Sequence, residues 1–178
     1  MLAGCTSVTG GAPNPVSAAS TGADPTSARQ GGSTPRVSNP KKLRGADPCA
    51  LLTESQLRAL GLPTASRPGK SGWGEDKCTW SGDIRVTLSP DTKGKGLSEY
   101  YARQKAYDNF KSSEASGFPV VWTDFASTIC SVMAGVADDQ VLVVHVGSVS
   151  SRSRAQGNPC GYGETVVAEV LGNLPAGG

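Results

Sequence analysis

The sequence has few of the residues and motifs on which most enzyme active sites depend. Its 178 residues include a single histidine, His145, and no GxSxG or HExxH motif. The glycine cluster at 94–96 is too short for a phosphate-binding loop, and no complete GxxxxGKS/T motif occurs. Because His145 lies within an apolar stretch, we interpret it as a structural residue, and we expect no enzymatic activity.

Long apolar runs and basic stripes are also missing. No run reaches the 18 apolar residues of a membrane-spanning helix. Basic residues are not interleaved with aromatic residues, so we expect no nucleic-acid partner. The net charge of +2 divides into +4 over residues 6–45 and −2 over residues 46–178. The cluster Lys41, Lys42 and Arg44 permits attraction to anionic lipid or polymer, but we favour a solvated domain boundary.

Aromatic residues are absent from positions 6–45, where 22 of 40 residues are Gly, Pro, Ser or Thr. Such a segment cannot bury enough apolar surface to offset the entropy lost on ordering. We therefore predict a disordered linker over residues 6–45. A flexible coil of that length has a root-mean-square span of roughly 35 Å.

The first five residues, Met1-Leu2-Ala3-Gly4-Cys5, match the bacterial lipobox. Small residues before the cysteine suit the lipoprotein signal peptidase, and the Cys5 thiol accepts a diacylglyceryl group. We expect residues 1–5 to be the remnant of a signal peptide, because the usual apolar region of ~7–15 residues does not fit before Cys5. The prediction is a protein anchored through lipid on Cys5 at the extracytoplasmic side of the cell membrane. The alternative is a chance LAGC in a cytosolic protein.

Residues 46–178 are expected to form one α+β domain. Thr53 and Gln56 form a capping-box pattern at the start of a helix that ends at Gly61. Further helices are predicted over 97–110 and 164–171, and a loop over 63–76. About five strands are predicted, over 77–80, 83–88, 118–122, 128–136 and 140–147. The last strand is nearly continuously apolar, which predicts a central place in an antiparallel sheet packed by N-terminal, middle and C-terminal helices.

Four cysteines remain after Cys5, and an even number in an exported domain predicts two disulfides. Their separations are too wide for the close pairs of a structural zinc site, so we expect no metal or cofactor. Three connectivities are possible. We favour the local pairs Cys49–Cys78 and Cys130–Cys160, each of which ties a helix entrance to a strand.

Several short patterns together resemble a known family. They are Asp47-Pro48-Cys49, Leu51-Leu52-Thr53, Leu60-Gly61, Cys78-x-Trp80, Cys130-Ser131-Val132 and Asn158-Pro159-Cys160. This combination is similar to an actinobacterial lipoprotein family of unknown function, the domain of unknown function 3558 group. The resemblance covers roughly residues 46–175 and includes the lipobox. It implies secretion, lipid anchoring and an α+β domain, and it supplies no catalytic residues.

The function is therefore predicted by class. We rank a binding or interaction module first, a carrier of an apolar envelope ligand second and a cell-wall hydrolase a distant third. A large apolar pocket would favour the carrier. Convergent carboxylates would favour the hydrolase, but no pattern indicates that Glu99, Asp108 and Asp124 converge. The expected partners are the membrane and an envelope protein or apolar ligand, and we expect a monomer.

Overall fold

The structure is a computed structural model that describes residues 34–177, and its fold is α+β. The predicted lipidation site Cys5 and residues 6–33 of the predicted linker lie outside the described residues. Seven strands form one antiparallel sheet in the order β1-β2-β3-β7-β6-β5-β4. The strands are β1 (Arg67–Lys70), β2 (Asp76–Ser81), β3 (Ile84–Asp91), β4 (Phe110–Ala115), β5 (Phe118–Thr123), β6 (Ile129–Ala137) and β7 (Gln140–Ser148). The helices are α1 (Glu54–Leu60), α2 (Leu97–Ala102) and α3 (Pro159–Asn173), with a short 3-10 turn at Gln104–Ala106.

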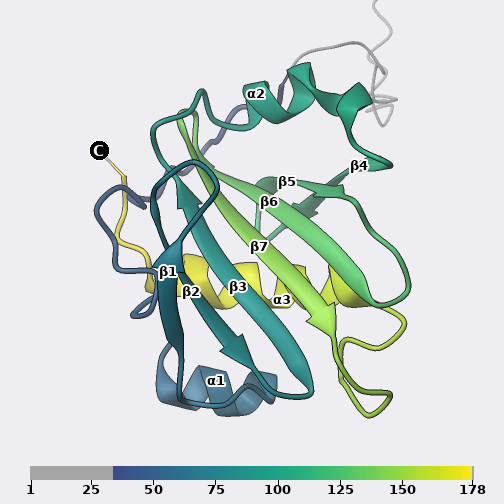
Figure 1. Cartoon of the computed structure of the whole chain (residues 1–178). Coiled ribbons are helices and arrows are strands. Elements are labelled where there is room, and N and C mark those ends of the chain that lie inside the picture. Colours follow the sequence, from purple (N-terminus) through teal and green to yellow (C-terminus); the bar gives the residue numbers. More distant parts are fainter. Residues whose placement is uncertain (1–33, 178) are drawn as a thin grey trace, which may run out of the picture. The chain divides into compact units, whose positions relative to one another are not determined.

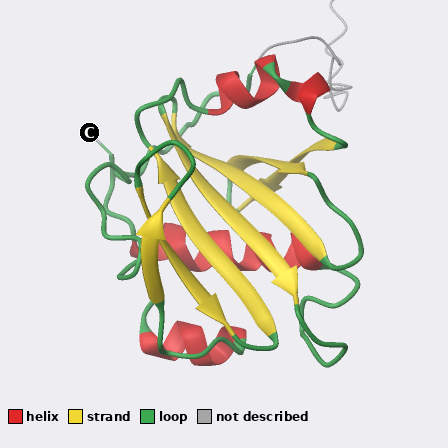
Figure 2. Cartoon of the chain, viewed as in Figure 1, coloured by secondary structure: helices red, strands yellow, loops and turns green. Residues whose placement is uncertain are grey.

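The two faces of the sheet are covered very differently (Figure 1). Helices α1 and α3 lie behind the sheet in this view, whereas α2 lies at one end of the sheet (Figure 2). The main core lies between the sheet and the pair α1 and α3. It includes Leu57, Leu60, Trp80, Val144 and Val166. A smaller cluster beneath α2 joins Leu97 and Tyr100 to the opposite face of β6 and β7. Over much of that opposite face, no helix from residues 34–177 lies against the sheet.

Strand β7 holds the central position that its apolar sequence predicts. It pairs with β3 on one side and with β6 on the other, and its residues from Val141 to Val144 are buried. Side chains alternate across the sheet, so Leu142 and Val144 face the main core while Val141 and Val143 face α2. His145 is next on the α2 side, beyond the end of that helix, and it is exposed.

The helix termini follow local signals in the sequence. The capping box at Thr53 and Gln56 is present, and Gly61 ends α1 in the left-handed conformation with φ of 75°. The side chain of Asn158 accepts a hydrogen bond from the Gly161 amide and caps α3, with Pro159 in the first turn.

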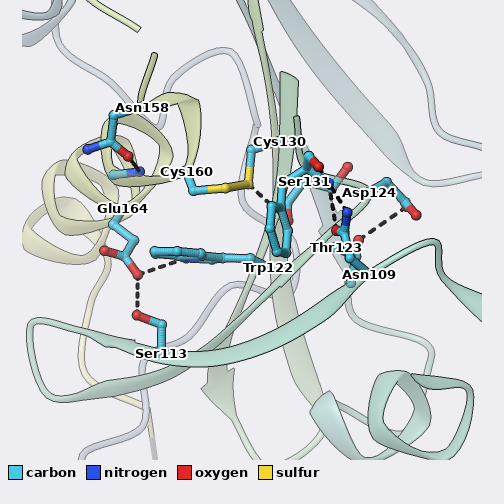
Figure 3. The surroundings of a disulfide bond; sticks show 12 residues. Asn109, Ser113, Trp122, Thr123, Asp124, Cys130, Ser131, Asn158, Cys160 and Glu164 are labelled. Atoms are coloured by element: carbon cyan, nitrogen blue, oxygen red, sulfur yellow. Dashed lines mark hydrogen bonds between the residues drawn. A yellow bond between two sulfur atoms is a disulfide. The ribbon is translucent and has the colours of Figure 1, made fainter. Parts of the chain in front are cut away.

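Two disulfides join Cys49 to Cys78 and Cys130 to Cys160, which is the local pairing favoured by the sequence. The second bond links β6 to the first turn of α3 (Figure 3). Beside it, Glu164 of α3 accepts hydrogen bonds from Trp122 and Ser113 on the β4–β5 hairpin. These contacts fix α3 against one half of the sheet.

The sheet has seven strands, so the prediction of about five was too low. Strand β1 lies inside the predicted loop 63–76, and all four of its residues are exposed. It has no apolar alternation, and Pro68 suits an edge position. Strand β4 is the opposite edge and is also mostly polar. Because the strand prediction relied on buried apolar residues, it missed both edges.

Two helix boundaries differ from the prediction by five residues or more. Helix α2 ends at Ala102, not at residue 110. Reciprocal hydrogen bonds between the Asn109 side chain and the Phe125 backbone hold the chain in a non-helical conformation there. Helix α3 begins at Pro159, five residues before the predicted start. The Asn158 side chain caps the helix there, several residues before the apolar residues on which the prediction was based.

The domain begins before Ala46, which corrects the predicted end of the linker. Leu43 is fully buried in the main core, and its amide and that of Arg44 donate to the Gln140 side chain. The Lys41 amide donates to the carbonyl of Val136, and Arg44 pairs with Asp139 at 2.8 Å. Composition hid this segment, because its one fully buried leucine stands among polar residues, a proline and basic residues. We call residues 37–44 the strap.

Replacement of Leu43 by alanine tests whether the strap belongs to the domain. Leu43→Ala should lower the free energy of unfolding by about 2–5 kcal/mol, the usual cost of truncating a buried leucine. The matched control is Val149→Ala at a side chain that is 59% exposed, where we expect a change within about 0.5 kcal/mol. Denaturant titration with intact disulfides measures both. Equal unfolding midpoints for the two variants would show that the strap is part of the linker and not of the folded domain.

The disulfide pairing is tested by non-reducing peptide mapping. We expect linked peptides containing Cys49 with Cys78 and Cys130 with Cys160. With separations of 29 and 30 residues, each bond should stabilise the domain by roughly 3–4 kcal/mol in the chain-entropy model. A peptide linking Cys49 to Cys160 would refute the arrangement, and four free thiols would also remove the argument for export.

Candidate functional site

A groove crosses the face of the sheet that α1 and α3 do not cover. Its larger part has a volume of about 630 Å³ and lies between α2, the β1–β2 loop and the strands β6 and β7. A smaller part of about 290 Å³ continues over β3, β7 and β6. The two parts share Asp124, Ser131 and His145, so together they form one site, which we call the sheet groove.

The floor of the sheet groove follows from strand alternation. Met133 and Val143 form its apolar part next to α2, and Ser131 and His145 continue the same face two residues further along their strands. Ser131 and His145 are cross-strand partners, and the Ser131 hydroxyl lies 2.9 Å from Nδ1 of His145. A structural hydrogen bond therefore uses one ring nitrogen, as the sequence interpretation of His145 suggested, but the exposed ring also lines the groove.

The environment of His145 favours the neutral form of its imidazole. Desolvation by the surrounding sheet, followed by the positive charge of Lys77, lowers the pKa of His145 below its ordinary value, while Asp124 opposes the shift. In the described part of the chain, no hydrogen bond joins His145 to a carboxylate. The pair with Ser131 therefore lacks the orienting acid of a serine hydrolase triad.

Asp124 places a carboxylate in both parts of the groove. It follows β5 directly and has a positive φ of 50°, a conformation that aspartate tolerates better than most residues. From the described residues, its oxygens accept two long hydrogen bonds of 3.3 Å, donated by the Asp108 amide and the Thr123 hydroxyl. Among residues 34–177 it has no salt bridge to a basic side chain. Asp124 therefore retains capacity to accept hydrogen bonds from a ligand.

The α2 side of the groove contains fixed charged and aromatic groups. Arg103 pairs with Glu99 at 3.2 Å and lies over the ring of Tyr100, 5.7 Å from its centroid. The Tyr100 hydroxyl donates to Asp91 at 2.8 Å. Burial and then this hydrogen bond raise the pKa of Tyr100 far above its usual value. Burial also raises the pKa of the half-buried Tyr107, with Arg103 opposing.

The three carboxylates considered for a hydrolase, Glu99, Asp108 and Asp124, do not come together as a set. Glu99 and Asp124 both line the groove, whereas Asp108 does not and meets Asp124 only through its backbone amide. Instead, Glu99 lies near Asp91, with Gly94 between them. A Cβ atom added to Gly94 would lie 3.0 Å from Glu99 Oε2 and 2.9 Å from Asp91 Oδ1, which shows that both carboxylates approach the same point. Sequence reasoning missed Asp91, and the only available signal was its place at the end of a strand.

The charges that line the groove are balanced. The basic residues are Arg85, Lys93 and Arg103, and the acidic residues are Asp91, Glu99 and Asp124. Within the described residues, no group of three His, Cys, Asp or Glu side chains is placed to hold a metal ion. No helix among residues 34–177 has the length and apolar character needed to cross a bilayer.

The state of His145 is testable by NMR titration. We expect a midpoint below 6.5, and Lys77→Gln should raise it because a neighbouring positive charge is removed. Lys111→Gln is the control, since Lys111 lies over the Trp122 ring, on the other side of the sheet, and does not line the groove. As the pH falls, His145 takes up its proton at a higher pH in the unfolded chain than in the folded domain. The free energy of unfolding should therefore fall as the pH drops from about 6.5 toward the folded midpoint. A midpoint above 6.5 would contradict the proposed environment.

Comparison with known proteins adds a family but no activity. Neither a curated protein nor a solved structure matches the chain. A family model described as "Protein of unknown function (DUF3558)" matches residues 1–173, which includes nearly all of the folded domain. The chain therefore belongs to the DUF3558 family of proteins of unknown function.

Proposed function

We propose that this protein is an exported, lipid-anchored cell-envelope protein whose folded domain is a binding module, and that the sheet groove is its binding site. The observation that carries the proposal is the open, charge-balanced groove on the face that α1 and α3 leave uncovered. The lipobox at Cys5 and the two disulfides support an anchored, extracytoplasmic location.

The groove suits recognition better than enclosed transport. The groove is open to solvent, and its wall carries charged and hydroxyl-bearing groups beside the apolar floor formed by Met133 and Val143. A carrier of an apolar ligand needs a pocket that removes most of the ligand surface from water. The sheet groove is therefore a poor match for an acyl chain, and we rank the carrier hypothesis below the binding module.

Hydrolysis remains the weaker alternative. Its supporting observation is the approach of Asp91 and Glu99 at Gly94. Each carboxylate already accepts from a fixed protein donor, the Tyr100 hydroxyl for Asp91 and the Lys95 amide for Glu99, and Glu99 also pairs with Arg103. This arrangement serves to hold the groove wall in place, so we rank catalysis below binding.

Anchoring is tested with the Cys5→Ala variant, expressed with a complete export signal. The variant should move from the membrane to the soluble fraction, because the lost acyl chains supply ~0.8 kcal/mol per buried CH₂ group. Cys5→Ser is a second variant that keeps a polar group of similar size. Detergent partitioning equal to that of the wild type in both variants would contradict the lipid-anchor proposal.

Use of the groove is tested by native mass spectrometry of the protein isolated from its own host. We expect a non-covalently bound mass, in addition to the covalent lipid proposed on Cys5, that Ser131→Trp removes because the indole would occupy the groove floor beside His145. Val149→Trp is the matched control at an exposed site that does not line the groove. A ligand mass that persists in Ser131→Trp would place binding elsewhere.

A further inference from the structure

The β1–β2 loop presents a tryptophan to the groove in a fixed position. Trp73 is 41% exposed, whereas Trp80 on the neighbouring strand β2 is buried. Its indole nitrogen donates to the Pro90 carbonyl at 2.8 Å, which sets the ring orientation. Since that nitrogen is occupied, the contact that Trp73 offers a ligand is the apolar face of its ring.

The loop itself is held by a network of hydrogen bonds. The Ser71 hydroxyl and backbone bond to Glu75 across the turn. The Glu75 carboxylate then accepts from the amide and the hydroxyl of buried Thr92, at 2.8 and 2.7 Å. These bonds hold the loop against the end of β3, so the exposure of Trp73 is built into the fold and does not reflect a loose loop.

The rest of the groove excludes several ligand classes. Three basic and three acidic side chains balance in charge, which does not favour a strongly anionic or cationic polymer. The floor is the face of a sheet whose central strands are paired on both edges, so it offers no free backbone for an added peptide strand. The open shape disfavours an acyl chain, because the groove would leave much of such a chain in contact with water.

We infer that the sheet groove binds a neutral saccharide chain, with Trp73 stacking on the C–H face of one sugar ring and Asp124 accepting hydrogen bonds from hydroxyl groups. The inference rests on the proposed function of the groove and names its ligand class. His145, neutral with Nδ1 bound to Ser131, leaves Nε2 to bond a further hydroxyl. The groove continues past Asp124 into its second part, which suits a chain of more than one ring.

Titration of the full chain carrying Cys5→Ala with cellotetraose, maltotetraose, mannotetraose and chitotetraose tests the inference. Calorimetry should give a Kd of about 1 mM or tighter for at least one of them, and a blue shift of tryptophan emission should accompany binding. A heparin tetrasaccharide should bind more weakly than that sugar. Preferential binding of heparin would overturn the claim that the ligand is neutral.

Paired substitutions test the assigned contacts. Trp73→Ala should weaken binding at least about fivefold, while Trp73→Phe, which keeps an aromatic face, should retain most of it. Asp124→Asn, which keeps the shape but loses the charge, should weaken binding by a similar factor, and Val149→Ala should leave it unchanged. Wild-type affinity in Trp73→Ala, or no binding to any of the four neutral sugars, would overturn the saccharide assignment.

The experiments distinguish a wrong ligand class from a wrong binding site. If none of the sugars binds but the host-derived ligand mass is lost in Ser131→Trp, the groove binds a ligand of another class. If that mass also persists in Ser131→Trp, the groove is not the binding site and both proposals fail.

Discussion

The structure depends on how the two central strands, β6 and β7, are covered. Helix α3 is fixed over one face by the Cys130–Cys160 bond and by close packing, since a Cβ atom on Gly163 would lie 2.6 Å from Val132. On the other face, the short helix α2 covers only the end around Met133 and Val143. Beyond that end, the same strands expose Ser131 and His145. The groove is therefore the direct result of a long sheet and a short covering helix.

Features with strong local signals were predictable from the sequence. The capping box at Thr53 defined α1, and the apolar run from Val141 defined the central strand. The edge strands β1 and β4 were not predictable in the same way, because exposed edges carry little of the apolar alternation that marks buried strands. The strap was missed for a similar reason: one buried side chain, Leu43, fixes a segment whose average composition resembles a linker.

The candidate site was less predictable than the fold because its residues come from distant segments. Asp91 ends β3, Asp124 follows β5 and His145 lies within β7, and only the order of those strands in the sheet brings them to one groove. Trp73 lay in a segment predicted to be loop, where nothing local indicates that Glu75 and Thr92 hold it in place. His145 was identified as the only histidine, but its exposure depends on the length of α2.

The central claim is that the uncovered face of the sheet is the binding surface. The most direct measurement is a crystal structure of the protein isolated from its own host with its retained ligand. We expect ligand density in contact with Trp73 and Asp124, over the floor formed by β6 and β7. Ligand density at the edge of β4, or beneath α3, with an empty groove would contradict it.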